Sequence, residues 1–197
     1  MHTHRNRLAP VVLAIALFTS GCGYNRIQTL DEATSQSKQQ ISVQLQRRAD
    51  LIPNLVEVVK GFAAQEAQVF ETVAEARAKL AGAAASGDLA QMSAASQQMN
   101  GALGRLIAIS ESYPLLKSNE NFLRLQDELA GTENRVAVAR TDYNTTVNAY
   151  NAYIRKFPQL MTAKVMGMKA REYFELTNAA AAEVPKVDFA PPGGKTP

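Results

Sequence analysis

A stripe of apolar residues, recurring at alternating spacings of four and three, most constrains what this chain can fold into. Every position of the stripe is apolar except Arg48 and Glu66. A repeat sustained over this length is typical of a helix that packs along its whole length in a bundle or coiled coil. The stripe consists of Ile41, Leu45, Arg48, Ile52, Leu55, Val59, Phe62, Glu66, Val69, Val73, Ala76 and Leu80.

Pro53 lies inside this segment, and the stripe keeps its phase across it. We therefore expect one helix over Leu30–Gly82, kinked at Pro53 but not ended there. Proline lacks an amide hydrogen, so it frees the carbonyl of Ala49. Asp50 and Asn54 flank the kink, and we favour hydrogen bonding to the freed backbone groups over catalysis as their role.

Two further long helices are expected. Asp88 with Gln91 forms a capping pattern for a second helix that ends before Pro114. Its apolar stripe is Met92, Ala95, Met99, Ala102, Leu106, Ile109 and Tyr113. A third helix begins after an N-cap at Ser118 or Asn119 and ends before Pro158. Its stripe is Phe122, Leu125, Leu129, Thr132, Val136, Ala139, Tyr143, Thr146, Tyr150, Tyr153 and Phe157.

The remaining residues predict a short fourth helix, over either Gln159–Met166 or Lys169–Ala181, and an extended tail over 185–197. The fold class is therefore all-α: an elongated antiparallel up-and-down bundle of three long helices over 30–184. The first helix, about 78 Å long, is longer than the second can match. Its Leu30–Gln46 end is expected to form a stalk, or to pair with the third helix or another chain.

Residues 1–21 have the organisation of a signal peptide. Arg5 and Arg7 precede an apolar run over Leu8–Phe18, which is too short to span a bilayer. Small residues follow, and then Cys22. The segment resembles a bacterial lipoprotein signal, although Thr19 stands where that signal usually has Leu. The alternative is an ordinary secretory signal with an incidental cysteine.

The lipoprotein resemblance implies cleavage before Cys22, a diacylglycerol on its sulfur and a fatty acid such as palmitate on its amino group. Several acyl chains suffice for stable anchoring. Residues 22–29 then form a lipid-anchored linker. The bundle faces the periplasm of a bacterial cell envelope, and Gly23, in place of the Asp that often signals inner-membrane retention, favours the outer membrane.

Composition argues against most catalytic designs. The 197 residues include 46% hydrophobic residues, enough for one domain with a core, but only two histidines, His2 and His4, and one cysteine. A chain processed at Cys22 has no imidazole for a nucleophilic triad or a metal site. We therefore expect no enzyme activity, no metal and no cofactor. Glu128 and Glu133 do not share a helix face, so they do not support a glycosidase pair.

Bulk charge argues against nucleic-acid binding. Without Arg5 and Arg7, the 21 Lys and Arg residues fall to 19, against 18 Asp and Glu. A nearly neutral domain lacks the electrostatic attraction that a nucleic-acid backbone requires.

Four stretches resemble the LemA family across nearly the whole mature chain. They are "VQLQRRADLIPNLVEVVKGFAAQE" (Val43–Glu66), "YPLLKSNENFLRLQDELAGTENRVAVARTDYN" (Tyr113–Asn144), "VNAYNAYIRKFP" (Val147–Pro158) and "PKVDF" (Pro185–Phe189). The resemblance implies a bacterial membrane-associated helical bundle, with most of the chain outside the cytoplasm and no established catalytic residues. Many members carry an amino-terminal transmembrane helix, where this chain has the lipoprotein-like signal.

The two charges on the first stripe predict interhelical ion pairs that set register. A hairpin folded about Ala84–Gly87 would place Glu66 opposite Arg105, and we predict that pair. Arg48 requires a carboxylate from the third helix. The candidates are Asp127, Glu128 and Glu133.

A polar stripe of Arg140, Asn144, Asn148 and Asn151 lies on one face of the third helix. Asparagine is a mediocre helix former, so these amides are expected to bind something. Three interpretations of this stripe are open: an interhelical network, a solvated face, or a recognition surface that includes the interleaved Tyr143, Tyr150 and Tyr153. Arg47, Asp50 and Asn54, off the apolar seam, are candidates for the same kind of surface.

The function that best fits these features is a lipid-anchored, non-catalytic scaffold or protein-interaction module of the cell envelope. Its partners are the membrane, through Cys22, an unidentified envelope protein and, in a homo-oligomer, a second copy of the chain. The alternative is a binding module for a small apolar or peptide ligand held within the bundle. "KVDF" near the end of the chain docks either on the bundle or on another protein.

Overall fold

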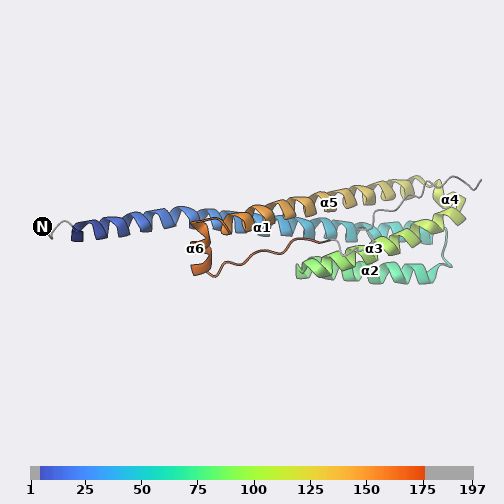
Figure 1. Ribbon diagram of the computed structural model, residues 1–197. Helices are drawn as coiled ribbons and strands as arrows, with labels where there is room; N and C mark the ends of the chain where they lie inside the picture. Colours follow the sequence, from blue (N-terminus) through green and yellow to red (C-terminus); the bar gives the residue numbers. More distant parts are fainter. Residues whose placement is uncertain (1–4, 176–197) are drawn as a thin grey trace, which may run out of the picture.

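The computed structural model describes the backbone of residues 5–175 and the side chains of residues 23–175. The described part is helical with no strand, and it forms a long rod (Figure 1). Its elements are α1 (Arg5–Lys60), α2 (Ala67–Ser86), α3 (Leu89–Ile109), the 3₁₀ turn η1 (Ser110–Ser112), α4 (Pro114–Lys117), α5 (Glu120–Ile154) and α6 (Gln159–Val165). The expected tail over 185–197 and its "KVDF" motif lie outside the described residues.

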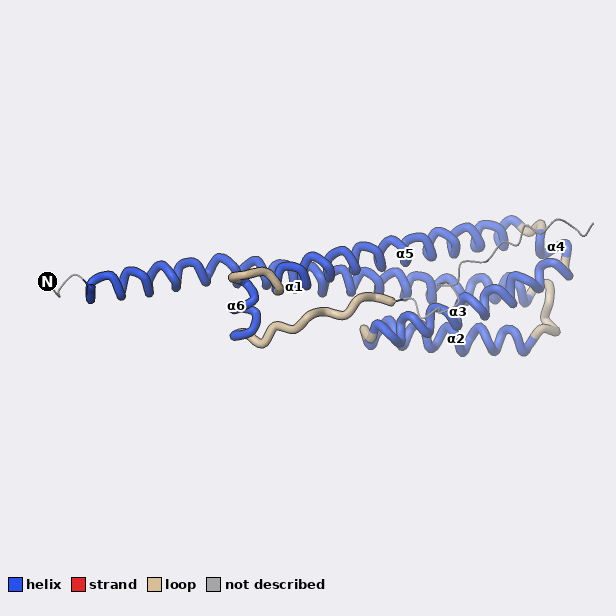
Figure 2. The backbone as a smooth tube through the Cα atoms, viewed as in Figure 1, coloured by secondary structure: helices blue, strands red, loops and turns tan. Residues whose placement is uncertain are grey.

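The prediction of one helix over Leu30–Gly82 is wrong. α1 continues past Pro53, as the phase of the stripe indicated, but it ends at Lys60. Residues 61–66 form a turn, and α2 runs back along α1 (Figure 2). Phe62, Glu66 and Val69 continue the repeat across this turn, yet Phe62 is exposed and the other two are only half-buried. Folding back lets the second half of the stripe pack against the first.

The second and third helix starts are as expected. Asp88 caps α3 by accepting a hydrogen bond from the amide of Gln91, and Asn119 caps α5 by accepting one from the amide of Phe122. The turn between α2 and α3 is short because Gly87 adopts a left-handed conformation with φ 68°, which only glycine takes without steric cost.

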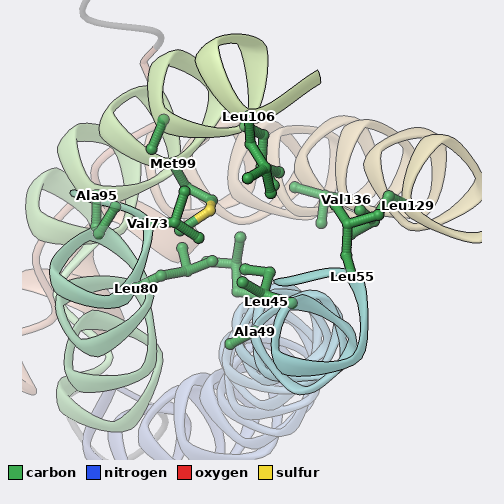
Figure 3. Packing of buried hydrophobic residues seen from close by; sticks show 14 of the residues in the cluster. Leu45, Ala49, Leu55, Val73, Leu80, Ala95, Met99, Leu106, Leu129 and Val136 are labelled. Atoms are coloured by element: carbon green, nitrogen blue, oxygen red, sulfur yellow. The ribbon is translucent and has the colours of Figure 1, made fainter. Parts of the chain in front are cut away.

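The bundle therefore has four long helices, not three, that alternate in direction along the rod: α1, α2, α3 and α5 (Figure 1). α1 packs most extensively against α5, and α2 packs against α3. The pairing of α1 with α5 confirms one of the alternatives for the amino-terminal end of the first helix. Figure 3 shows the buried residues of all four helices pointing into one shared core.

A second, smaller core lies at the amino-terminal end of the bundle, where Ile27 of α1 packs with Tyr150, Ile154 and Ala163. Residues 22–29, expected as a linker, are a continuous part of α1. Within the described part of the chain, no helix has both the length and the apolar character that a membrane crossing requires.

After α6, Gly167 (φ 67°) turns the chain into an extended segment, residues 168–175, which we call the strap. The strap returns along the bundle toward α3 (Figure 2). Of the two positions considered for the short helix, the structure has the one at Gln159, and residues 169–175 are not helical.

Candidate interaction surface on α5

Two asparagines of α5 bind the backbone of the strap in the same way. The side-chain amide of Asn151 donates to the carbonyl of Arg171 at 2.9 Å, and its oxygen accepts from the Arg171 amide at 2.8 Å. Asn144 repeats this pattern with Phe174, at 3.1 Å and 2.8 Å. Each asparagine therefore satisfies both polar groups of one strap residue. We call Asn144 and Asn151 the asparagine pair.

The spacing of these contacts follows from chain geometry. Seven helical residues rise about 10.5 Å along α5. Three residues of extended chain cover about 10 Å. An extended segment that lies along the helix therefore meets asparagines at positions i and i+7 with residues three apart, as Arg171 and Phe174 are. Because the contacts are to the backbone, they are independent of side-chain identity.

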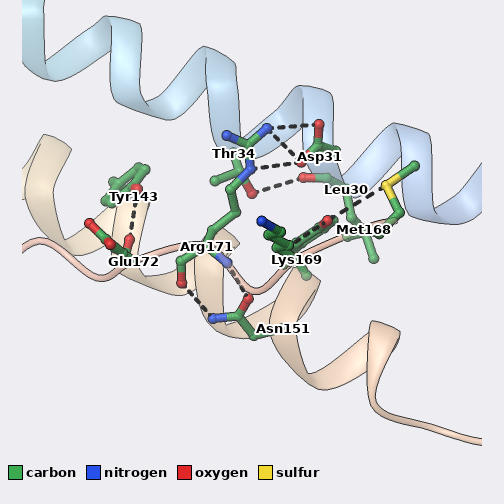
Figure 4. Close-up of polar contacts among 10 residues, drawn as sticks. Leu30, Asp31, Thr34, Tyr143, Asn151, Met168, Lys169, Arg171 and Glu172 are labelled. Atoms are coloured by element: carbon green, nitrogen blue, oxygen red, sulfur yellow. Dashed lines mark hydrogen bonds and ion pairs between the residues drawn. The ribbon is translucent and has the colours of Figure 1, made fainter. Parts of the chain in front are cut away.

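Tyrosine hydroxyls bind further strap carbonyls. Tyr143 donates to the carbonyl of Glu172 at 2.8 Å (Figure 4). Tyr150 donates to the carbonyl of Lys169 at 3.2 Å. Burial raises the pKa of both tyrosines above the ordinary value, so both remain neutral donors at physiological pH. The strap is thus held by alternating amide and phenol contacts along most of its length.

Side chains of the strap fix its position between helices. The guanidinium of Arg171 makes two hydrogen bonds of 2.9 Å to Asp31 of α1 (Figure 4). Phe174 is 5% exposed, and the guanidinium of Arg140 lies 4.8 Å from its ring centroid. Residues Arg171 and Phe174, which carry the backbone contacts, are therefore also the residues with anchored side chains.

Arg140 belongs to a charge cluster inside the bundle. It donates to Ser96 of α3 at 2.8 Å, and the carboxylate of Glu133 lies near it on α5. Glu133 forms an ion pair with Arg48 of α1, which confirms the expectation that Arg48 pairs with a carboxylate from this helix. Burial lowers the pKa of both arginines from the ordinary value, and Glu133 opposes that effect.

The polar stripe is therefore divided among several roles. Arg140, Asn144 and Asn151 are engaged with the strap, whereas Asn148 is exposed and accepts a long 3.4 Å hydrogen bond from the hydroxyl of Tyr173. Within the described part of the chain, the interhelical contact predicted for this stripe is the one that Arg140 makes with Ser96 of α3.

The other candidate residues lie apart. Arg47, Asp50 and Asn54 are exposed on α1, and among the described residues no hydrogen bond joins them to the asparagine pair. Asp50 accepts from Gln46 at 2.8 Å, one turn earlier. The Ala49 carbonyl that Pro53 frees accepts from Arg77 of α2 at 2.9 Å. The expectation that Asp50 or Asn54 serves the proline is therefore wrong, because a neighbouring helix supplies the donor.

The structure also does not form the expected Glu66–Arg105 ion pair among the described residues. Glu66 precedes α2 and accepts a 3.4 Å hydrogen bond from Tyr113, while Arg105 lies beside Thr72 and Glu75. The reason is register: α2 extends to Ser86, so the turn comes later than assumed and the facing positions shift.

A polar cleft of about 670 Å³ lies where the strap passes between α1 and the turn that joins α2 to α3. Lys38, Ser42 and Ser86 line it, together with Arg171 and Glu172 of the strap. Among the described residues, no group of His, Cys, Asp and Glu is arranged to hold a metal ion.

Comparison with known proteins identifies the family. The sequence model of the LemA family matches residues 37–189. The chain belongs to the LemA family. The match includes α5 and the whole strap, so the asparagine pair and its occupant are both within the family domain of this LemA protein.

Curated relatives of this LemA-family chain are magnetosome proteins. It is 29% identical over 175 residues to magnetosome proteins MamQ 1 and MamQ 2 of Paramagnetospirillum magneticum, covering 77% of this chain and 64% of each relative. It is 28% identical over 192 residues to MamQ of Magnetospirillum gryphiswaldense, covering 85% of this chain and 71% of the relative. The chain thus spans a little under two thirds of the first two relatives.

The sequence pattern identified the asparagine stripe but not its occupant. Arg171 and Phe174 carry no periodic signal of their own, because an extended segment held by another element has no repeat that the sequence exposes. The available signal was the asparagine spacing itself: amides seven residues apart on a helix match an extended chain.

Proposed function

We propose that this LemA-family protein is a lipid-anchored, non-catalytic scaffold of the bacterial cell envelope that holds extended peptide segments along α5. The observation that carries the proposal is the double hydrogen bonding of the asparagine pair to the strap backbone. A surface that binds backbone groups at a fixed spacing can bind extended segments of different sequence. The strap is then the resident segment, and a partner segment takes its place.

The side-chain contacts of the strap indicate what such a segment needs. Asp31 favours a basic residue at the position of Arg171, and the site beside Arg140 favours an aromatic residue three positions later. The proposed partner is therefore an envelope protein with an extended segment that carries Arg or Lys followed, three residues on, by Phe or Tyr.

A peptide is better supported than the small apolar ligand of the alternative hypothesis. The cleft at the strap is lined mainly by hydroxyl, amide and charged groups. Such a lining suits a polar chain with its own hydrogen-bonding groups, because an apolar ligand would leave those groups unsatisfied.

Membrane attachment through Cys22 and a periplasmic location with the outer membrane favoured are part of this proposal. The signal-like sequence over 1–21 supports the attachment and the periplasmic location, and Gly23 after Cys22 favours the outer membrane. Radiolabelled palmitate should appear on the wild-type protein and be absent from Cys22→Ala. Equal labelling of both would rule out the anchor.

The scaffold role is tested by photo-crosslinking in living cells. A photoreactive amino acid at exposed Asn148, beside the strap, should give a high-mass adduct with an envelope protein. The same group at Glu57, whose side chain is 73% exposed on α1, serves as the control. The adduct should disappear in an Asn144→Ala/Asn151→Ala background. Crosslinks to the strap alone, with no second protein, would contradict the proposal.

A further inference from the structure

The segment from Arg155 to Arg171 is rich in basic residues and has no acidic ones. It contains Arg155, Lys156, Lys164, Lys169 and Arg171, and the nearest carboxylates in sequence are Asp142 and Glu172. Arg171 is paired with Asp31, but the other four cations are exposed and form none of the ion pairs found among the described residues. We call residues 155–169 the foot.

The foot also exposes large apolar side chains. Phe157 is 83% exposed, Met161 57%, Val165 83% and Met166 51%. Phe157 is the last residue of the apolar stripe predicted for the third helix, yet it lies beyond the end of α5 and outside the core. Scattered exposed apolar residues are ordinary, but four within ten residues among exposed cations are typical of an interfacial segment.

The two sides of α6 differ. Ala163 faces the small core with Ile27, Tyr150 and Ile154. Met161 and Val165, four residues apart, share the side turned away from Ala163. α6 lies across the long axis of the rod and not along it (Figure 1). A helix crossing the axis presents its outer side to whatever lies beyond the end of the bundle.

That end of the bundle is the one from which α1 continues toward the amino terminus (Figure 1). A β-carbon added at Gly23 would lie 3.5 Å from Cγ of Gln159, so the start of α6 lies beside the residue that follows Cys22. The apolar run Leu8–Phe18 and Cys22 both precede this point. If either of them attaches the chain to a membrane, the membrane surface lies close to Gly23, at the level of α6.

We propose that the foot is a membrane-contact site that binds anionic phospholipid headgroups through Arg155, Lys156, Lys164 and Lys169. Phe157, Met161 and Val165 enter the boundary between headgroups and acyl chains. Uniform positive charge favours a lipid surface over a second copy of this foot, since two copies would repel each other. The contact gives the rod a second point of attachment besides its amino-terminal end, and two points of attachment orient it relative to the bilayer.

The test uses tryptophan fluorescence, because the full chain contains no Trp. Phe157→Trp and Val165→Trp are each introduced into the full-length protein and reconstituted into vesicles of phosphatidylcholine and phosphatidylglycerol with a brominated phosphatidylcholine. Both should be strongly quenched by the brominated chains. Leu115→Trp, 76% exposed at the opposite end of the rod, should not be quenched. Circular dichroism checks that each variant is helical.

Charge dependence separates specific contact from simple nearness. Quenching of the Phe157→Trp variant should fall to the level of the Leu115→Trp control when phosphatidylglycerol is omitted or when Lys156, Lys164 and Lys169 are all changed to Glu. Quenching that equals the control in anionic vesicles would overturn the proposal. A blue shift without quenching would do so too, because it would mean that protein covers the foot. Loss of the Asn148 crosslink would leave this result unaffected, so the two proposals fail separately.

Discussion

Asparagine is costly inside a helix, because its amide competes with the backbone for hydrogen bonds. In α5 the side-chain amides of the asparagine pair bind the backbone of the strap and not that of their own helix. The strap has no secondary structure, so these side chains supply partners for its backbone groups. Each bond of this kind contributes about 1 kcal/mol. At this scale the choice of residue follows from the need to donate and accept at one position, which no aliphatic side chain meets.

Replacing Asn151 with Ala should release the amino-terminal half of the strap, around Arg171, without unfolding the bundle. Two hydrogen bonds are lost, at an expected local cost of about 2 kcal/mol. Hydrogen exchange at the Arg171 amide should accelerate roughly thirtyfold, while amides in the core of α5 keep their protection. Asn148→Ala is the matched control and should change neither. Unchanged exchange in Asn151→Ala would mean that the strap is held by its side chains.

Glu133 should matter more to stability than its half-buried position suggests, because its carboxylate is close to the buried guanidinium of Arg48 and the half-buried one of Arg140. Glu133→Ala leaves Arg48 and Arg140 without their counter-charge and should lower the free energy of unfolding by about 2 kcal/mol in urea denaturation. Glu128→Ala, exposed on the same helix, should have little effect. Arg48→Met should recover part of the loss in the Glu133→Ala background; additive losses would show that the charges do not interact.

At the scale of elements, sequence periodicity predicted which faces are buried better than where helices end. The stripe on α3, and the stripe on α5 as far as Tyr143, match the buried residues closely. Beyond Tyr143 the buried positions shift to Val147 and Ile154, and Phe157, the last residue of the predicted stripe, is exposed. The break over 61–66 was missed because Phe62 and Glu66 continue the heptad phase through a turn, and nothing in a repeat distinguishes one long helix from two that fold back in phase. The strap was missed for the complementary reason, since it has no repeat at all.

Pro53 illustrates how one element depends on another. The Ala49 carbonyl that it frees on α1 accepts a hydrogen bond from Arg77 of α2. The hydrogen bond lost within α1 is therefore replaced by one between α1 and α2. Arg77→Ala should cost about 1 kcal/mol in the wild-type chain. In a Pro53→Ala background, where the new amide hydrogen can bind the Ala49 carbonyl, the same change should cost little. Urea denaturation of the four proteins measures this coupling, with Lys79→Ala as an exposed control; equal costs in both backgrounds would argue against it.

For the whole molecule, the rod has a free amino-terminal extension of α1 at one end and the α4 turn at the other (Figure 1). The foot and the asparagine pair are joined by the strap, which runs directly from one to the other. Its position is fixed at Arg171 and Phe174, and these contacts come from α1 and α5 together. The strap therefore links the end of the molecule from which α1 extends to the surface of α5 that carries the asparagine pair.

Removing the strap and supplying it separately tests this arrangement as a whole. A chain that ends at Gly167 keeps all seven elements of the described part and should retain their helicity by circular dichroism. The peptide MKAREYFE, residues 168–175, should bind this chain in a fluorescence anisotropy titration, because the asparagine pair and the site beside Arg140 are then empty.

Changing the residue that corresponds to Phe174 to Ala should weaken binding about tenfold or more, as expected from the loss of one buried aromatic side chain. Asn144→Ala/Asn151→Ala in the shortened chain should abolish binding, and Asn148→Ala should not. If the shortened chain stays helical but binds the peptide no better than the full-length chain does, α5 does not hold extended segments by itself.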